Sequence, residues 1–181
     1  APITPAQRAA RRARLGRSLG ELGVDALLCE SGATMTHLSG VSWGRSERLF
    51  GLVVLADGSS FWICPAFEAG KARRSIDGAG IQGAEIVLWD EHEYAWGPLA
   101  AALRARGVRR VGIEPHARFF IAHRLERELG AGSVVSGAEA VLRLRARKEP
   151  EELALLRGAS ERTQQAMTAV AVHVRPRMTG R

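Results

Sequence analysis

Apolar residues recur along the chain with two different spacings, which predict an alternating series of helices and strands. Segment 4–7 forms a capping box with proline at the first helical position. Leu15, Leu19 and Leu22 then place one apolar face on a helix that we expect to run to about Glu21. Short continuous apolar runs are typical of buried strands. Such runs predict strands at 24–29, 49–55, 60–64, 84–89, 109–113 and 134–135.

The connections between these runs predict the fold class. Asp57 and Gly58 separate two of the strands, which is a strong signal for a β-hairpin. A short helix carrying Met35 and Leu38 precedes this hairpin and ends at Gly40. An early hairpin followed by strand–helix alternation predicts an α/β fold: a mixed sheet of five or six strands with helices on both faces. The later helices are expected at 65–74, 98–106, 117–129 and 138–144.

The last part of the chain predicts one long helix. Pro150 suits its first position, and the neighbouring glutamates lie where the helix dipole favours negative charge. We predict a domain at 1–146 and a linker helix at 147–181 that leads toward a second domain absent from these residues. The apolar stripe outruns the edge of one domain, so we expect self-association or a frayed C-terminal half. Its members are Leu156, Ala159, Thr163, Met167, Val170 and Val174.

Charge raises the possibility of nucleic-acid binding. The 181 residues carry a net charge of +7, and all but two of the 26 basic side chains are arginine. The arginines are spread along the chain, aromatic residues make up 6%, and no RNP-type motif accompanies them. We therefore expect solvated arginines and no nucleic-acid partner. We also expect no membrane partner, because no apolar run approaches the ~18 residues of a membrane span.

The two cysteines bear on the cellular compartment. Cys29 and Cys64 both fall in predicted strands, so we expect buried reduced thiols, with a disulfide between neighbouring strands as the alternative. The chain begins at Ala1 and carries no recognisable signal peptide. We expect a cytoplasmic protein. A periplasmic or secreted one would follow if a leader had been removed.

Two sequence patterns suggest a chemical site, but their surroundings argue against one. Segment 78–83 matches G-x-G-x-x-G, but a predicted helix precedes it and a strand follows, the reverse of a dinucleotide site. His92 lies among acidic residues in segment 90–93, and four consecutive loop residues cannot all face one metal ion. No serine, cysteine or lysine has a nucleophile context. We therefore predict no catalytic residue and no metal ligand in this chain.

The segment 41–49 is the one candidate recognition element. Trp43, Arg45 and Arg48 lie in a loop between a helix and a strand, and these residue types dominate contact energy at interfaces. The alternative is structural: Trp43 packs on the core, and the arginines pair with Glu47 or with solvent. The residues alone leave both interpretations open.

Several segments, taken in order, resemble the N-terminal domain of the creatinase/prolidase/aminopeptidase P family of "pita-bread" metallohydrolases. Four positions depart from the family pattern. His37 replaces an aromatic residue, Gly44 separates the tryptophan from the arginine, and Arg177 replaces a glycine. Gly180 likewise stands where the family has a glutamate. The resembling segments are 22–28, 36–40, 43–49, 65–68, 147–153 and 176–179.

The resemblance implies a function for a longer protein. In this family a C-terminal domain holds two divalent metals, usually Mn²⁺, Co²⁺ or Zn²⁺, on two Asp, one His and two Glu, and cleaves the bond before proline. The N-terminal domain shapes the substrate entrance and joins subunits into dimers or tetramers. The resemblance implies that Trp43, Arg45 and Arg48 contact a proline-containing peptide, while the chain alone is inactive and holds no cofactor.

Several alternatives stay open at this point. The chain could be a truncated fragment or a naturally short product. It could also act as a standalone oligomerisation module, or belong to a creatinase-like C–N hydrolase. The residues do not separate a dipeptidase from an aminopeptidase.

Overall fold

The computed structural model describes residues 3–175, 178 and 179, so most of the motif predicted at 176–180 lies outside the described residues. The chain divides into two units. One unit is Thr4–Ala146, and the other contains the residues from Arg147 onward together with the N-terminal end. Each unit is described by itself.

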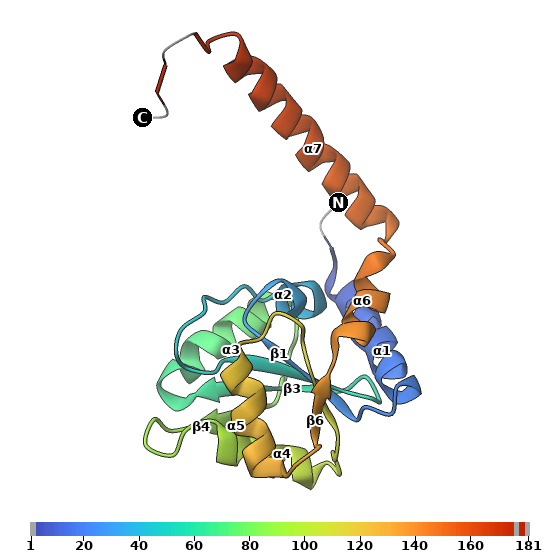
Figure 1. Cartoon of the computed structure of the whole chain (residues 1–181), viewed down its shortest axis with the longest axis vertical. Coiled ribbons are helices and arrows are strands. Elements are labelled where there is room, and N and C mark those ends of the chain that lie inside the picture. The colour runs from blue at the N-terminus through green and yellow to red at the C-terminus, as the bar shows by residue number, and fades with distance from the viewer. Residues whose placement is uncertain (1–2, 176–177, 180–181) are drawn as a thin grey trace. The chain divides into compact units, whose positions relative to one another are not determined.

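The larger unit is built on a six-stranded mixed sheet with the strand order β4-β3-β2-β1-β5-β6 (Figure 1). β2 runs antiparallel to both of its neighbours, and every other pairing is parallel. Five strands therefore point the same way. The strands are β1 (Ala26–Glu30), β2 (Gly51–Leu55), β3 (Ser60–Pro65), β4 (Ile86–Trp89), β5 (Val111–Ile113) and β6 (Val134–Ser136).

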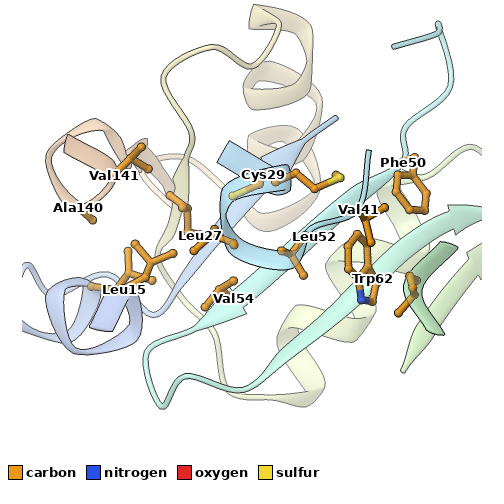
Figure 2. Packing of buried hydrophobic residues seen from close by; sticks show 14 of the residues in the cluster. Leu15, Leu27, Cys29, Val41, Phe50, Leu52, Val54, Trp62, Ala140 and Val141 are labelled. Carbon is orange, nitrogen blue, oxygen red and sulfur yellow. The ribbon is translucent and has the colours of Figure 1, made fainter. Parts of the chain in front are cut away.

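Helices cover both faces of this sheet, as predicted for the fold class. Alternate residues of the central strands face opposite layers: Leu27 packs with one set of helices and Leu28 with the other. Figure 2 shows the first layer around Leu27, Leu52 and Trp62. That layer comprises α1 (Pro5–Glu21), α2 (Ala33–Ser39), α3 (Ala69–Gly78) and α6 (Ala138–Ala146), and the opposite layer comprises α4 (Trp96–Ala105) and α5 (Phe119–Leu129).

Local capping and turn chemistry behave as the sequence predicts. Thr4 Oγ1 accepts a hydrogen bond from Gln7 N at 3.2 Å, and Thr4 N donates to Gln7 Oε1 at 2.8 Å, which completes the capping box of α1. Gly40 ends α2 in the left-handed conformation at φ 80°. The predicted hairpin joins β2 to β3.

The helix expected after Pro65 was predicted with the wrong bounds at both ends. The helix expected at 65–74 is a 3₁₀ turn, Ala66–Glu68, followed by α3, which continues to Gly78. Pro65 cannot open the helix because it still belongs to β3, where it pairs with Trp89 of β4. The helix continues past Arg74 because Ile76 is buried in the core. Burial of Ile76 therefore determines the C-terminal end of α3, which local helix propensity does not predict.

The two cysteines are free and fully buried, on neighbouring parts of the same face of the sheet. Burial raises the pKa of Cys64 to about 12 and raises the pKa of Cys29 well above its ordinary value. A raised pKa keeps each thiol protonated below that value, and the thiolate is the reactive form.

We therefore expect neither cysteine to react with a thiol reagent at about pH 8 in the folded chain, and both to react in denaturant. The measurement is absorbance on titration with Ellman's reagent, with and without denaturant. A rapid reaction of the folded chain would contradict this burial.

The smaller unit contains the long helix α7 (Pro150–Ala171), which confirms the prediction of one long C-terminal helix. Glu149 caps it in a capping box with Glu152, and Glu149 N donates to Glu152 Oε2 at 2.9 Å. The stripe residues Met167 and Val170 are more than half exposed. Self-association or fraying of α7 stays a prediction. None of the helices in the described part of the chain combines the length and apolar character needed to span a bilayer.

Candidate functional site

The carboxyl ends of the five parallel strands lie at one edge of the sheet, and the loop before β2 enters at this same edge. Glu30 ends β1, Trp89 ends β4, and Glu114 directly follows β5. The pairing of Glu30 with Gly51 places the start of β2, and hence loop 41–50, beside them. In open α/β sheets this edge is where ligands bind, because the loops there are free to vary.

Two buried glutamates, Glu30 and Glu114, lie side by side at this edge of the sheet, and we call them the base of the site. Glu30 is bound by Arg118, whose backbone N–H donates to Oε2 at 3.2 Å and whose Nε donates to Oε1 at 2.6 Å. Arg118 Nη2 forms a further ion pair with the same carboxylate. Glu114 Oε2 accepts from Thr34 Oγ1 at 3.1 Å. Both carboxylates therefore have specific partners, as buried charges require.

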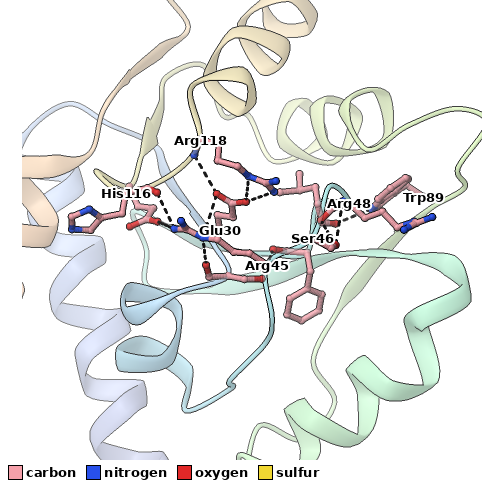
Figure 3. Close-up of polar contacts among 11 residues, drawn as sticks. Glu30, Arg45, Ser46, Arg48, Trp89, His116 and Arg118 are labelled. Atoms are coloured by element: carbon pink, nitrogen blue, oxygen red, sulfur yellow. Dashed lines mark hydrogen bonds and ion pairs between the residues drawn. The ribbon is translucent and has the colours of Figure 1, made fainter. Parts of the chain in front are cut away.

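Arg45 fastens loop 41–50 to this base (Figure 3). Its Nε donates to the carbonyl of Ser31 at 2.9 Å, and its Nη2 donates to the carbonyl of His116 at 2.9 Å. The guanidinium also lies 4.0 Å from a carboxylate oxygen of Glu30 and 4.0 Å from one of Glu114. We define the Arg45 network as Glu30, Arg45, Glu114 and Arg118. Its two positive and two negative charges balance.

Trp43 lies on the core side of the same loop. Its ring stacks on Phe50 with centroids 4.0 Å apart and an interplanar angle of 17°. Phe50 in turn stacks on Trp62 of β3. Lys71 Nζ lies 4.0 Å from the centroid of the Trp43 ring, within the range of a cation–π contact. Trp43 is therefore half-buried between the core and an ammonium group.

Arg48 is held by exposed acids. It forms ion pairs with Glu47 and with Glu91, and its guanidinium lies 5.2 Å from the ring centroid of Phe67. The hydrogen bond to Glu91 is the main reason that the pKa of Arg48 is raised above its ordinary value. Arg48 therefore stays charged, and a ligand carboxylate would compete with two glutamates for it.

Comparison with known proteins identifies this architecture. The family model described as "Creatinase/Prolidase N-terminal domain" matches residues 11–147. The chain belongs to this family. The creatinase/prolidase N-terminal domain thus covers nearly all of the larger unit.

A sequence relative and two solved structures are similar to this chain. The Bacillus subtilis protein named "Putative dipeptidase YkvY" is 29% identical over 151 residues, which are 82% of this chain and 40% of the relative. A dipeptidase structure from Pyrococcus horikoshii OT3 matches with a TM-score of 0.74 and 22% identity, over 90% of this chain and 44% of that one. The N-terminal domain of a Xaa-Pro dipeptidase from Lactobacillus brevis matches with a TM-score of 0.58 and 22% identity, over 67% of this chain and 89% of that one.

The difference in length between the proteins matters for function. The chain spans about 40% of the length of the curated relatives that it matches. The Lactobacillus brevis structure, a domain by itself, is covered to 89%. The matched region is therefore the N-terminal part of this architecture.

The metal pair known from this family does not fit the donors of the described residues. No group of three or more His, Cys, Asp or Glu side chains lies together among them. The two buried carboxylates of the Arg45 network are already bound to arginines and Thr34. The G-x-G-x-x-G segment begins at Gly78, the last residue of α3, and precedes β4, so it lacks a helix N-terminus for a phosphate.

The three predicted binding residues make different kinds of contact in the structure. The sequence analysis did not select Glu30 and Glu114, which also belong to the site. Arg45 joins the Glu30–Glu114 base, while Trp43 and Arg48 make the contacts of the structural alternative. A binding role for all three stays a prediction. Glu30 and Glu114 carried a usable signal, since each is an acid at the end of a short apolar run that predicts a buried strand.

Proposed function

We propose that this chain is the non-catalytic N-terminal domain of a peptidase that hydrolyses the bond before proline, and that hydrolysis belongs to a separate two-metal C-terminal domain. Membership of the creatinase/prolidase N-terminal domain family supports the proposal most directly. The partial coverage of the dipeptidase relatives, and the Xaa-Pro dipeptidase domain among the structural matches, support it further. We also propose a cytoplasmic location, because the two buried cysteines of this chain are free thiols.

In this proposal the domain shapes substrate access through loop 41–50. The Arg45 network is the observation that supports it, because two hydrogen bonds from Arg45 hold the loop at the carboxyl edge of the sheet. A guanidinium has five N–H donors, and two backbone carbonyls take only part of that capacity. The Arg45 side chain is 45% exposed, so its remaining donors can meet a peptide carboxylate. Trp43 and Arg48 would flank the same peptide.

The first test compares these 181 residues with the longer polypeptide that carries them followed by a pita-bread domain. Both are incubated with Mn²⁺ and an alanyl-proline dipeptide, and release of proline is measured. We expect hydrolysis by the longer polypeptide alone. Hydrolysis by the 181 residues would refute the non-catalytic assignment, and an inactive longer polypeptide with bound metals would refute the substrate assignment.

A second test concerns the loop residues in that longer polypeptide. Trp43→Ala and Arg45→Ala are each expected to lower kcat/KM about tenfold or more, because each removes a contact to bound peptide. Metal content should stay unchanged, since the metals belong to another domain. Arg127→Ala, an exposed arginine on α5, is the matched control. Unaltered kinetics in both loop variants would leave Trp43 and Arg45 with a structural role only.

Self-association is the second candidate function, and α7 favours it. Leu156, Met167 and Val170 recur along α7 and are each more than half exposed, which leaves apolar surface for a partner helix. We propose a dimer or tetramer formed by copies of this protein. Native mass spectrometry of the 181 residues should then show oligomers, and Met167→Glu should dissociate them. A monomer at every accessible concentration would exclude this role.

A further inference from the structure

We propose that a pocket at the carboxyl edge of the sheet, on the side of α4 and α5, binds a small carboxylic acid with a flat or bulky apolar body. We call it the aromatic pocket. Its volume is about 290 Å³, near the lower limit for small-molecule sites. It is separate from the contacts of Trp43 and Arg45 and does not depend on peptidase activity. It is lined by Glu47, Leu49, Trp89, Tyr94, Ala95, Trp96, Phe120 and Arg124.

Aromatic side chains are concentrated in this pocket. The chain has ten aromatic residues (four Trp, one Tyr and five Phe), and four of them line the pocket. Aromatic faces bind flat apolar groups by stacking and by burial of area. The lining therefore points to an apolar ligand body.

The walls of the pocket are held in place before any ligand binds. Trp89, the last residue of β4, donates from its indole Nε1 to the carbonyl of Leu49 at 3.0 Å. Trp96 and Phe120 meet edge to face, with ring centroids 6.0 Å apart and an interplanar angle of 89°. These contacts join α4 to α5 and β4 to loop 41–50. A fixed wall binds more tightly than a mobile one, because little side-chain freedom remains to be lost.

Tyr94 adds an independent sign of a binding site. Its backbone has φ 61°, and it is the one non-glycine residue at positive φ among the described residues. Its side chain is 65% exposed, so burial of the ring does not account for this conformation. The amide of Tyr94 donates to the carbonyl of Asp90 at 3.1 Å, which holds the turn. Residues kept in unfavourable backbone regions gather at ligand-binding sites.

The charges at the pocket select an acid rather than an amine. Glu47 forms an ion pair with Arg48, which Glu91 shares, so the charge of Glu47 is compensated in part. Arg124 makes no hydrogen bond, ion pair or ring contact with any part of the chain that the structure describes. Arg118 lies 4.8 Å from the ring centroid of Phe120, but its charge is paired with Glu30, which leaves Arg124 as the cation available to a ligand. An arginine binds a carboxylate through two parallel N–H donors.

The test uses three ligands of nearly equal shape and different charge: 3-phenylpropionate, 3-phenylpropionamide and 3-phenylpropylamine. Each is titrated into the 181-residue chain, and binding is followed by tryptophan fluorescence and by NMR shifts. We expect saturable binding of the acid, binding of the amide about tenfold weaker, and no saturable binding of the amine. No saturable binding of the acid, or binding of the amine as tight as that of the acid, would overturn the proposal.

Two variants locate the binding site within the fold. Arg124→Gln should weaken binding of the acid about tenfold and leave the amide unchanged, because it removes the charge and keeps the apolar walls. Phe120→Ala should weaken both ligands. Arg127→Gln, on the same helix but outside the pocket, is the control and should change neither. Equal affinity of the acid for Arg124→Gln and the unchanged chain would refute the assignment. Circular dichroism verifies that each variant is folded.

Discussion

Gly16→Ala is expected to lower the free energy of unfolding by about 3 kcal/mol, although alanine is the better helix former. Gly16 lies in the middle of α1, where the helix rests directly on the turn between β2 and β3. A Cβ at this position would lie 2.7 Å from Gly58 N, 2.8 Å from Ala56 O and 2.9 Å from Leu55 O.

All three of these neighbours of Gly16 are backbone atoms, so no side-chain rotation can relieve the contact. The helix must move away from the sheet, and Leu15 and Leu19 would then lose their packing in the core. Overpacking of this kind costs more than the roughly 1 kcal/mol that alanine gains over glycine inside a helix.

Gly20→Ala in the same helix is the matched control. A Cβ at Gly20 meets nothing within 4 Å, so the helix propensity acts alone. We expect this variant to be stabilised by about 0.5 kcal/mol. Denaturant unfolding of both variants measures the difference. Equal effects of the two substitutions would show that α1 does not rest on the hairpin turn as described.

Glu30→Gln is expected to lower the free energy of unfolding by about 2–3 kcal/mol. The buried carboxylate of Glu30 accepts hydrogen bonds from the backbone and side chain of Arg118. An amide of the same shape removes the charge and turns an NH₂ group toward a guanidinium, where neither group can accept a hydrogen bond. Arg118 is about one-third exposed and partly rehydrates, which keeps the cost below that of a fully buried pair.

The control for Glu30 is an ion pair of the same residue types in which the glutamate is exposed. Glu85 pairs with Arg106 and is 57% exposed, so Glu85→Gln should cost less than about 0.5 kcal/mol. Adding salt should weaken the exposed pair and leave the cost at Glu30 nearly unchanged. A cost at Glu30 no larger than at Glu85 would mean that the Arg45 network does not stabilise the fold.

Much of the fold was predictable because it follows from short-range patterns. Strands β1, β3 and β6 and helices α1 and α2 lie within a few residues of their predicted positions, while α7 begins close to its predicted start and ends at Ala171, short of the predicted 181. The predicted capping box at Thr4 and hairpin at Asp57 depend on residues three or fewer positions apart, so the sequence displays them directly. The predicted start of the helix after Pro65 was wrong because β3 ends where Pro65 pairs with Trp89, a residue remote in the chain.

The candidate site was predictable only in part, for the same reason. The tryptophan and arginines of loop 41–49 could be selected by residue type and by their position in a loop. The partners of Arg45 could not, since the carbonyl of His116 lies 71 positions away. Glu30 and Arg118 are 88 positions apart and meet only because β1 and β5 are parallel neighbours.

The sequence alone therefore determined the fold class, the order of the elements and the family resemblance of this protein, because each depends on local periodicity and on short motifs. The tertiary structure alone decided that Glu30, Arg45, Glu114 and Arg118 form one network and that four aromatic side chains share one pocket. The physical reason is strand pairing, which brings residues from distant parts of the chain to one edge of a sheet.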